Sequence, residues 1–304
     1  MMEATPQPDN KLLPRRVMLI SVIIALIILI FYIALDQASY FTNSWIKPLP
    51  TPWNDNVIYC LIILVAIPAS GIGFLLSRQF KPHEPQHQIW VFFALGWACW
   101  MLGEISAYIY TQIYSTLPDI TFSDLFWIAG YIFFGLSLFL QYALIYLRWS
   151  IEVRKKRTYL INFSLFVVLV MLLTLILTIL LRQAGFDQGS RWFYTYLNIF
   201  YPLCDLAEGA LALWFGYLFR RGILGRPWLG LLVFAVSDGI SSWYWLGGNK
   251  LVTPLTDSWL SLFTDILYIG GYLLTALACL SIFLVLRYGT GWQRKEVGGE
   301  PVGE

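Results

Sequence analysis

Long runs of apolar residues, separated by short polar segments, make up most of the chain. A membrane-spanning helix needs about 20 mostly apolar residues, each adding about 1.5 Å of rise. Eight stretches meet this requirement, at residues 17–35, 57–77, 89–110, 123–147, 159–181, 195–219, 227–246 and 261–287. The pattern therefore predicts an all-α fold, a polytopic integral membrane helical bundle with eight transmembrane helices.

The basic residues predict how this bundle is oriented. With the N-terminus placed in the cytoplasm, 16 Lys and Arg residues fall on the inner side and 4 on the outer side. Because an excess of Lys and Arg marks the cytoplasmic loops of membrane proteins, both termini are expected inside the cell. We therefore expect a multi-pass protein of the bacterial inner (plasma) membrane.

Two segments, one in each half of the chain, are similar in sequence. Ser123–Tyr131 reads SDLFWIAGY, and Thr264–Tyr272 reads TDILYIGGY. We interpret this similarity as an internal repeat of four helices, with copies at residues 17–147 and 159–287. A basic cytoplasmic linker (148–158) would join them, with cytoplasmic tails at 1–16 and 288–304, the latter disordered. An even number of helices in each copy predicts a pseudo-twofold axis along the membrane normal.

The composition excludes several classes of protein. Hydrophobic residues make up 58% of the chain and charged residues 12%, about half the charged fraction of soluble domains, which excludes a soluble enzyme. A net charge of +2 gives no reason to expect a nucleic-acid partner. The four cysteines lie in apolar stretches and both histidines in one polar loop, so we expect no disulfide, no metal site and no cofactor. No predicted span contains a lysine, which excludes a retinal Schiff base.

Six acidic residues lie inside the predicted spans with no Lys, Arg or His beside them. They are Glu104, Asp124, Asp205, Glu208, Asp238 and Asp265. A charge in the hydrocarbon layer costs about 3 kcal/mol or more. Such a carboxyl must therefore be protonated, hydrogen-bonded, hydrated or bound to an external cation. The directions of the spans place all six between the midplane and the outer surface.

Aromatic and hydroxyl side chains accompany these acids at helical spacing. Four aromatic candidates lie four or seven residues from an acid, namely Trp100, Tyr108, Tyr131 and Tyr272, and the same helix faces carry Trp127, Tyr268, Ser241 and Ser242. Carboxyls, phenols and ring faces together could bind a cation, an amine or a small amphipathic ligand. Asp124 and Asp265 follow Ser or Thr, so they are also interpreted as helix caps. A purely structural hydrogen-bonding role stays open for the other four acids.

One run of residues resembles a known family. Tyr201–Leu206 reads YPLCDL and resembles the YPxxDL element of a multi-helix membrane sensor region found before bacterial diguanylate cyclase and some histidine kinase domains. The Ser-Asp-x4-small-Gly-Tyr element at Ser123–Tyr131, its counterpart at Thr264–Tyr272 and the position of Asp238 fit the same pattern, over roughly residues 90–288. The resemblance implies a membrane sensory module.

The chain departs from this family after Arg287. The segment that follows is glycine-rich and too short for a cyclase or kinase domain, so we expect signalling through a separate partner at the cytoplasmic face. The sequence thus favours a sensory or ligand-binding module with an outward-facing acidic–aromatic pocket. The ligand is unknown and would be small or cationic. The module would be surrounded by the lipid bilayer. No residue is assigned a catalytic role.

Two alternatives stay open. Midplane acids and duplicated halves would also suit a small-solute or proton-coupled transporter. Ser237-Asp238 is loosely similar to an element of lysoplasmalogenase-type membrane enzymes, which would make the chain an intramembrane, acid-dependent lipid hydrolase.

Overall fold

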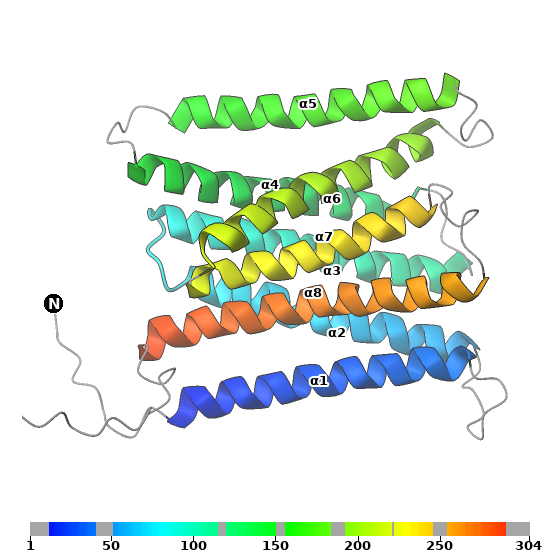
Figure 1. Cartoon of the computed structure of the whole chain (residues 1–304), viewed down its shortest axis with the longest axis horizontal. Coiled ribbons are helices and arrows are strands. Elements are labelled where there is room, and N and C mark those ends of the chain that lie inside the picture. Colours follow the sequence, from blue (N-terminus) through cyan, green and yellow to red (C-terminus); the bar gives the residue numbers. More distant parts are fainter. Residues whose placement is uncertain are drawn as a thin grey trace, which may run out of the picture.

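The described part of the chain folds into eight α helices and a short 3-10 helix (Figure 1). A computed structural model describes residues 12–40, 51–114, 120–149, 156–183, 192–220, 222–245 and 254–289. The helices are α1 (Leu12–Tyr40), α2 (Thr51–Ser77), α3 (Pro85–Tyr114), α4 (Phe122–Trp149), α5 (Lys156–Gln183), α6 (Trp192–Leu218), η2 (Ile223–Gly225), α7 (Arg226–Trp245) and α8 (Pro254–Tyr288). Each predicted span therefore corresponds to one helix, and the all-α prediction is confirmed.

Seven of the described helices are long and apolar enough to cross a membrane. The exception is α5, whose apolar segment in the searched residues is Val170–Gln183. In a bilayer a helix satisfies its own backbone N–H and C=O groups, which is why an apolar chain of this kind forms helices rather than open strands. By helix length and hydropathy, the chain is a multi-pass membrane protein.

The helices lie side by side, and consecutive helices run in opposite directions (Figure 1). α1 and α5 lie at opposite edges of the bundle, and both expose large apolar side chains, such as Ile27 and Ile30 on α1 and Leu172 and Ile176 on α5. These two helices therefore offer a surface suited to lipid. The odd-numbered helices end where the even-numbered ones begin, and we refer to that end of the bundle as the α3–α4 end.

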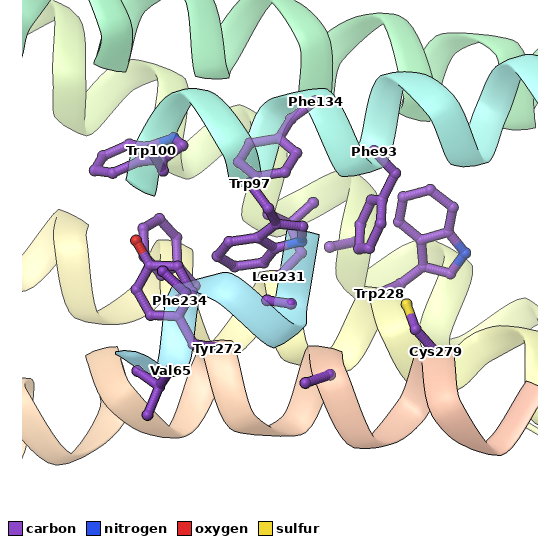
Figure 2. Close-up of a cluster of buried hydrophobic side chains, with 14 of the residues drawn as sticks. Val65, Phe93, Trp97, Trp100, Phe134, Trp228, Leu231, Phe234, Tyr272 and Cys279 are labelled. Carbon is purple, nitrogen blue, oxygen red and sulfur yellow. The ribbon is translucent and has the colours of Figure 1, made fainter. Parts of the chain in front are cut away.

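An aromatic cluster fills the centre of the bundle (Figure 2). Trp97 of α3 is fully buried, with the rings of Phe134 and Phe234 each 5.0 Å away and the ring of Tyr272 4.8 Å away, centroid to centroid. Lipid chains are as apolar as leucine, so close packing rather than exclusion of water joins helices in a membrane. Each such ring pair contributes about 0.5–1.5 kcal/mol. The cluster thereby joins α3, α4, α7 and α8 at one level.

Two glycines allow close contacts between neighbouring helices, Gly130 with the ring of Trp100 and Gly271 with the Cβ and backbone of Phe234. A Cβ atom at Gly130 would lie 2.5 Å from Trp100 Cδ1, and one at Gly271 would lie 2.7 Å from Phe234 Cβ. Both distances are shorter than a real carbon–carbon contact, so only glycine fits without displacement of its neighbour. These contacts bring α3 close to α4 and α7 close to α8, and they fix the level at which the polar residues on the next helical turns meet.

Candidate functional site

A polar cavity of about 180 Å³ lies among α3, α4, α6, α7 and α8. This acidic–aromatic cavity is lined by Trp100, Glu104, Trp127, Tyr201, Asp238, Ser241, Ser242 and Tyr268. Its volume corresponds to about six water molecules at about 30 Å³ each. The lining combines two carboxyls, two indole rings, two phenols and two hydroxyls, and no Lys, Arg or His of the described segments belongs to it.

Helical spacing places these side chains on the walls of the cavity. Trp100 and Glu104 are four residues apart on α3, and Asp238, Ser241 and Ser242 lie within four residues on α7, so each set shares one helix face. Ten residues separate Glu104 from the end of α3 at Tyr114, which is about 15 Å along the axis. The cavity therefore lies inside the bundle, between the aromatic cluster and the α3–α4 end.

Glu104 is held by a tyrosine of a distant helix. Its side chain is 7% exposed, and its Oε1 atom accepts a hydrogen bond of 2.5 Å from the hydroxyl of Tyr268 on α8. The Tyr268 ring packs on Phe234 at 4.9 Å between centroids, which fixes the donor. This bond fixes the position of the Glu104 carboxyl in the cavity lining.

Tyr131 bridges two further acids from different helices. Its hydroxyl oxygen lies 2.7 Å from Asp205 Oδ1 on α6 and 2.9 Å from Asp238 Oδ2 on α7. A phenol has one proton and donates it to one acceptor at a time. For both contacts to be hydrogen bonds, the other carboxyl must be protonated and donate to the phenol oxygen. The bridge is therefore a place where three groups share protons, and one of them, Asp238, lines the cavity.

Asp124 caps a helix, as one interpretation of the sequence had it, and it also bonds to a tyrosine of the cavity lining. Its Oδ2 accepts a 2.7 Å bond from the backbone N–H of Thr121, while the backbone N–H of Ser123 bonds to Thr121 Oγ1 at 3.1 Å. This is a capping box at the start of α4. In addition, Asp124 Oδ1 accepts a 2.6 Å bond from the hydroxyl of Tyr201, a residue that lines the cavity.

Only Glu104 and Asp238 of the six predicted acids belong to the described cavity lining; Asp124 and Asp205 bond to tyrosines near it, and the other two lie elsewhere. α8 begins at Pro254, well before the predicted start of the span at residue 261, so Asp265 lies within the helix and the capping interpretation does not apply to it. Asp265 is not part of the cavity lining. Glu208 lines a separate, apolar cavity on the other side of Tyr131.

Two of the predicted aromatic residues also lie away from the cavity. The Tyr108 ring lies 5.7 Å from the ring of Tyr59 on α2, because four residues after Glu104 the face of α3 has turned toward that helix. Tyr272 is fully buried in the aromatic cluster, and its hydroxyl has no hydrogen-bonding partner among the residues that the structure describes.

The lining contains one residue whose role the sequence did not indicate. Tyr201 was part of the YPLCDL element, but its bond to Asp124 joins residues 77 positions apart. Trp127, Tyr268, Ser241 and Ser242, which share helix faces with the acids, all lie in the lining. Spacing within one helix indicated those four, whereas nothing in the sequence indicates which tyrosine approaches a given acid from another helix.

The polar groups around the cavity are only partly paired. Trp100 Nε1, Trp127 Nε1 and Asp205 Oδ2 are buried without a hydrogen-bonding partner in the described segments. Buried polar atoms are nearly always paired in folded proteins, by protein groups, water or a ligand, so these three atoms could bond to a molecule bound among them. Within the same segments, no group of three or more His, Cys, Asp or Glu residues is placed to hold a metal ion.

The function has to be argued from this geometry. No protein-family model, no curated protein and no solved structure matches this chain.

Proposed function

We propose that this protein is a membrane sensory module that binds a small organic cation in the acidic–aromatic cavity. The proposal rests on one observation, the presence of the Glu104 and Asp238 carboxyls beside the rings of Trp100 and Trp127 in a lining to which the described residues contribute no basic side chain. An ammonium group is attracted both by carboxylates and by the faces of indole rings, and a desolvated cation–ring contact contributes about 2 kcal/mol or more.

The size of the cavity favours a compact ligand. At about 180 Å³ it is smaller than the 300–1,000 Å³ typical of sites for drug-sized molecules. A tetramethylammonium ion or a primary amine with a few carbon atoms fits this description. The hydroxyls of Ser241 and Ser242 would accept hydrogen bonds from an amine, while Tyr268 holds the Glu104 carboxyl in place.

Signalling would follow from the number of helices around the ligand. Five helices contribute to the lining, so a cation that draws Glu104 of α3 and Asp238 of α7 together changes the packing of several helices at once. We place the cavity on the outward side of the membrane and the output at a separate cytoplasmic partner. The similarity of YPLCDL to sensor regions agrees with this role.

The proposal includes the two-copy organisation. The first residue of α6 lies as many positions after the first residue of α2 as Thr264 lies after Ser123. The last residues of the two helices are separated by the same number of positions. α7 begins at this same spacing after the start of α3. The positions of these two helix pairs thus agree with the offset between the two similar sequence segments, whereas the starts of α4 and α8, and of α1 and α5, are separated by other spacings. Two copies with the same direction through the membrane would place their interface around the aromatic cluster, where a ligand could alter it.

Titration of the purified protein with tetramethylammonium tests this function. We expect saturable binding, weakened about tenfold or more in Glu104→Gln and in Asp238→Asn, because a hydrogen bond or ion contact to a charged group contributes about 1.5–3 kcal/mol and about 1.4 kcal/mol corresponds to a tenfold change. Asp265→Asn is the matched control, since Asp265 does not line the cavity, and it should bind like the wild type. Unchanged affinity in both cavity variants would refute the proposal.

One observation favours transport as a second candidate. Tyr131 connects Asp238, which lines the cavity, to Asp205, which lies one helical turn from Glu208. A row of proton-carrying groups inside a bundle is typical of proton-coupled carriers. In proteoliposomes, uptake of labelled tetramethylammonium that follows a pH gradient and is lost in Asp205→Asn would establish transport. Binding without uptake would favour the sensor.

A further inference from the structure

A second cavity, of about 300 Å³, lies between α4, α5 and α6. Its walls are almost wholly apolar and include Ile132, Leu138, Val170, Met171, Phe200 and Leu211. Ile132 and Met171 are about two-fifths exposed, at 43% and 39%, and α5 lies at the edge of the bundle (Figure 1). This lateral groove therefore opens on the side of the bundle, toward the bilayer, rather than toward either end.

One carboxyl lies in this apolar wall. Glu208 is 7% exposed and lines the groove, and no described residue forms a hydrogen bond with it. Among the residues whose side chains the structure describes, no Lys, Arg or His lines the groove. Burial of a carboxyl without a hydrogen-bonding partner costs free energy. A ligand in the groove with a positively charged head group that donates a hydrogen bond would remove that cost.

The depth of Glu208 restricts which molecule could reach it. Glu208 lies 16 residues after the start of α6 at Trp192, about 24 Å along a helix of about 40 Å. The carboxyl is thus near the middle of the bundle. The head groups of bilayer phospholipids lie about 15 Å from the membrane midplane, so they remain too far away, and their phosphates would repel a carboxylate.

We propose that the lateral groove binds a lipophilic amine that enters from the bilayer, with its alkyl chain along the apolar wall and its ammonium group at Glu208. Charge complementarity selects the head, and the apolar wall selects the chain. This is a site separate from the acidic–aromatic cavity. Tyr131 forms part of the groove wall and also bonds to Asp238 of the cavity, so it lies between the two sites.

Native mass spectrometry of the full chain in detergent tests this site, with dodecylamine as the probe and dodecanol and dodecanoate as molecules with the same chain. We expect one dodecylamine to be retained, with affinity lowered about tenfold or more in Glu208→Gln. Ala207→Trp, which fills the groove, should abolish retention. Leu206→Trp is the matched control, because its neighbouring side chain is 71% exposed and does not line the groove.

Several outcomes would overturn the proposal. They are no retention of dodecylamine, equal retention of dodecanol, unchanged retention in Glu208→Gln, and occupation of the groove by a co-purified phospholipid. Thermal unfolding and tetramethylammonium binding, measured on the same variants, verify that each is folded. Since tetramethylammonium has no chain to place in the groove, loss of dodecylamine with intact tetramethylammonium binding separates this site from the acidic–aromatic cavity.

Discussion

Replacement of Tyr131 by Phe removes one oxygen atom, the hydroxyl that bridges two acids of different helices. The hydroxyl bonds to Asp205 Oδ1 at 2.7 Å and to Asp238 Oδ2 at 2.9 Å, and the Tyr131 side chain is only 5% exposed. The phenyl ring keeps its packing on Trp100 at 5.4 Å between centroids. The substitution therefore tests the two hydrogen bonds and leaves the ring contacts in place.

The expected cost follows from these contacts. A buried polar group that loses its partner costs about 1–3 kcal/mol in soluble proteins, whereas hydrogen bonds between membrane helices average about 0.6 kcal/mol, with a maximum near 1.7. Two carboxyls lose a contact here, and Asp205 Oδ2 is already unpaired in the described structure. We therefore expect Tyr131→Phe to lower the free energy of unfolding by about 1–3 kcal/mol.

The measurement is equilibrium unfolding in mixed micelles, and the chain offers a matched control. Tyr272 lies at the corresponding position of the second similar segment, it is fully buried, and its hydroxyl has no partner among the described residues. Tyr272→Phe should therefore be neutral or slightly stabilising. If Tyr131→Phe costs no more than Tyr272→Phe, the bridge does not stabilise the bundle and the reasoning from its geometry is wrong.

Three further predictions concern helix packing, capping and orientation. Gly271→Ala should destabilise the protein by about 1–3 kcal/mol, since the new Cβ would meet Phe234 Cβ at 2.7 Å. Gly270→Ala should stabilise it by about 0.5–1 kcal/mol, because a Cβ there has nothing within 4 Å. Thermal unfolding of the two variants compares these effects. Asp124→Ala should cost about 1–2 kcal/mol in the same assay through loss of the capping box and of the hydrogen bond from Tyr201. In a cysteine-free background, Lys81→Cys should react with an impermeant thiol reagent only from the cytoplasmic side, and reaction from outside would reverse the predicted orientation.

The helices could be predicted from the sequence because one physical requirement determines them. Each crossing must satisfy its backbone internally and present apolar side chains over about 20 residues, and each predicted span corresponds to a helix. The helix ends were less predictable. α8 begins at Pro254, in a polar segment before its apolar run, and this extension changed the interpretation of Asp265 from a helix cap to a residue within the helix.

The site was only partly predictable, and α3 shows why. Trp100 and Tyr108 are equally spaced from Glu104, four residues on either side, yet Trp100 lines the cavity and Tyr108 packs on Tyr59. α3 carries apolar and aromatic residues on all of its faces, because a helix in a membrane contacts other helices and lipid rather than water. Hydrophobic periodicity therefore does not distinguish the faces, and the partner of Glu104 is 164 residues away.

The way in which the acids are paired bears directly on what they can bind. Four of the six acids share a hydrogen bond with a tyrosine of another helix, in three groups: Glu104 with Tyr268, Asp124 with Tyr201, and Asp205 and Asp238 with Tyr131. A lysine or arginine in these positions would neutralise the carboxylates and exclude a cationic ligand by competition. A phenol stabilises a carboxyl by a hydrogen bond but adds no charge. Pairing with tyrosines thus allows the acids to be buried while their attraction for a cation is preserved, and the unpaired Glu208 is the acid for which a ligand's charge would matter most.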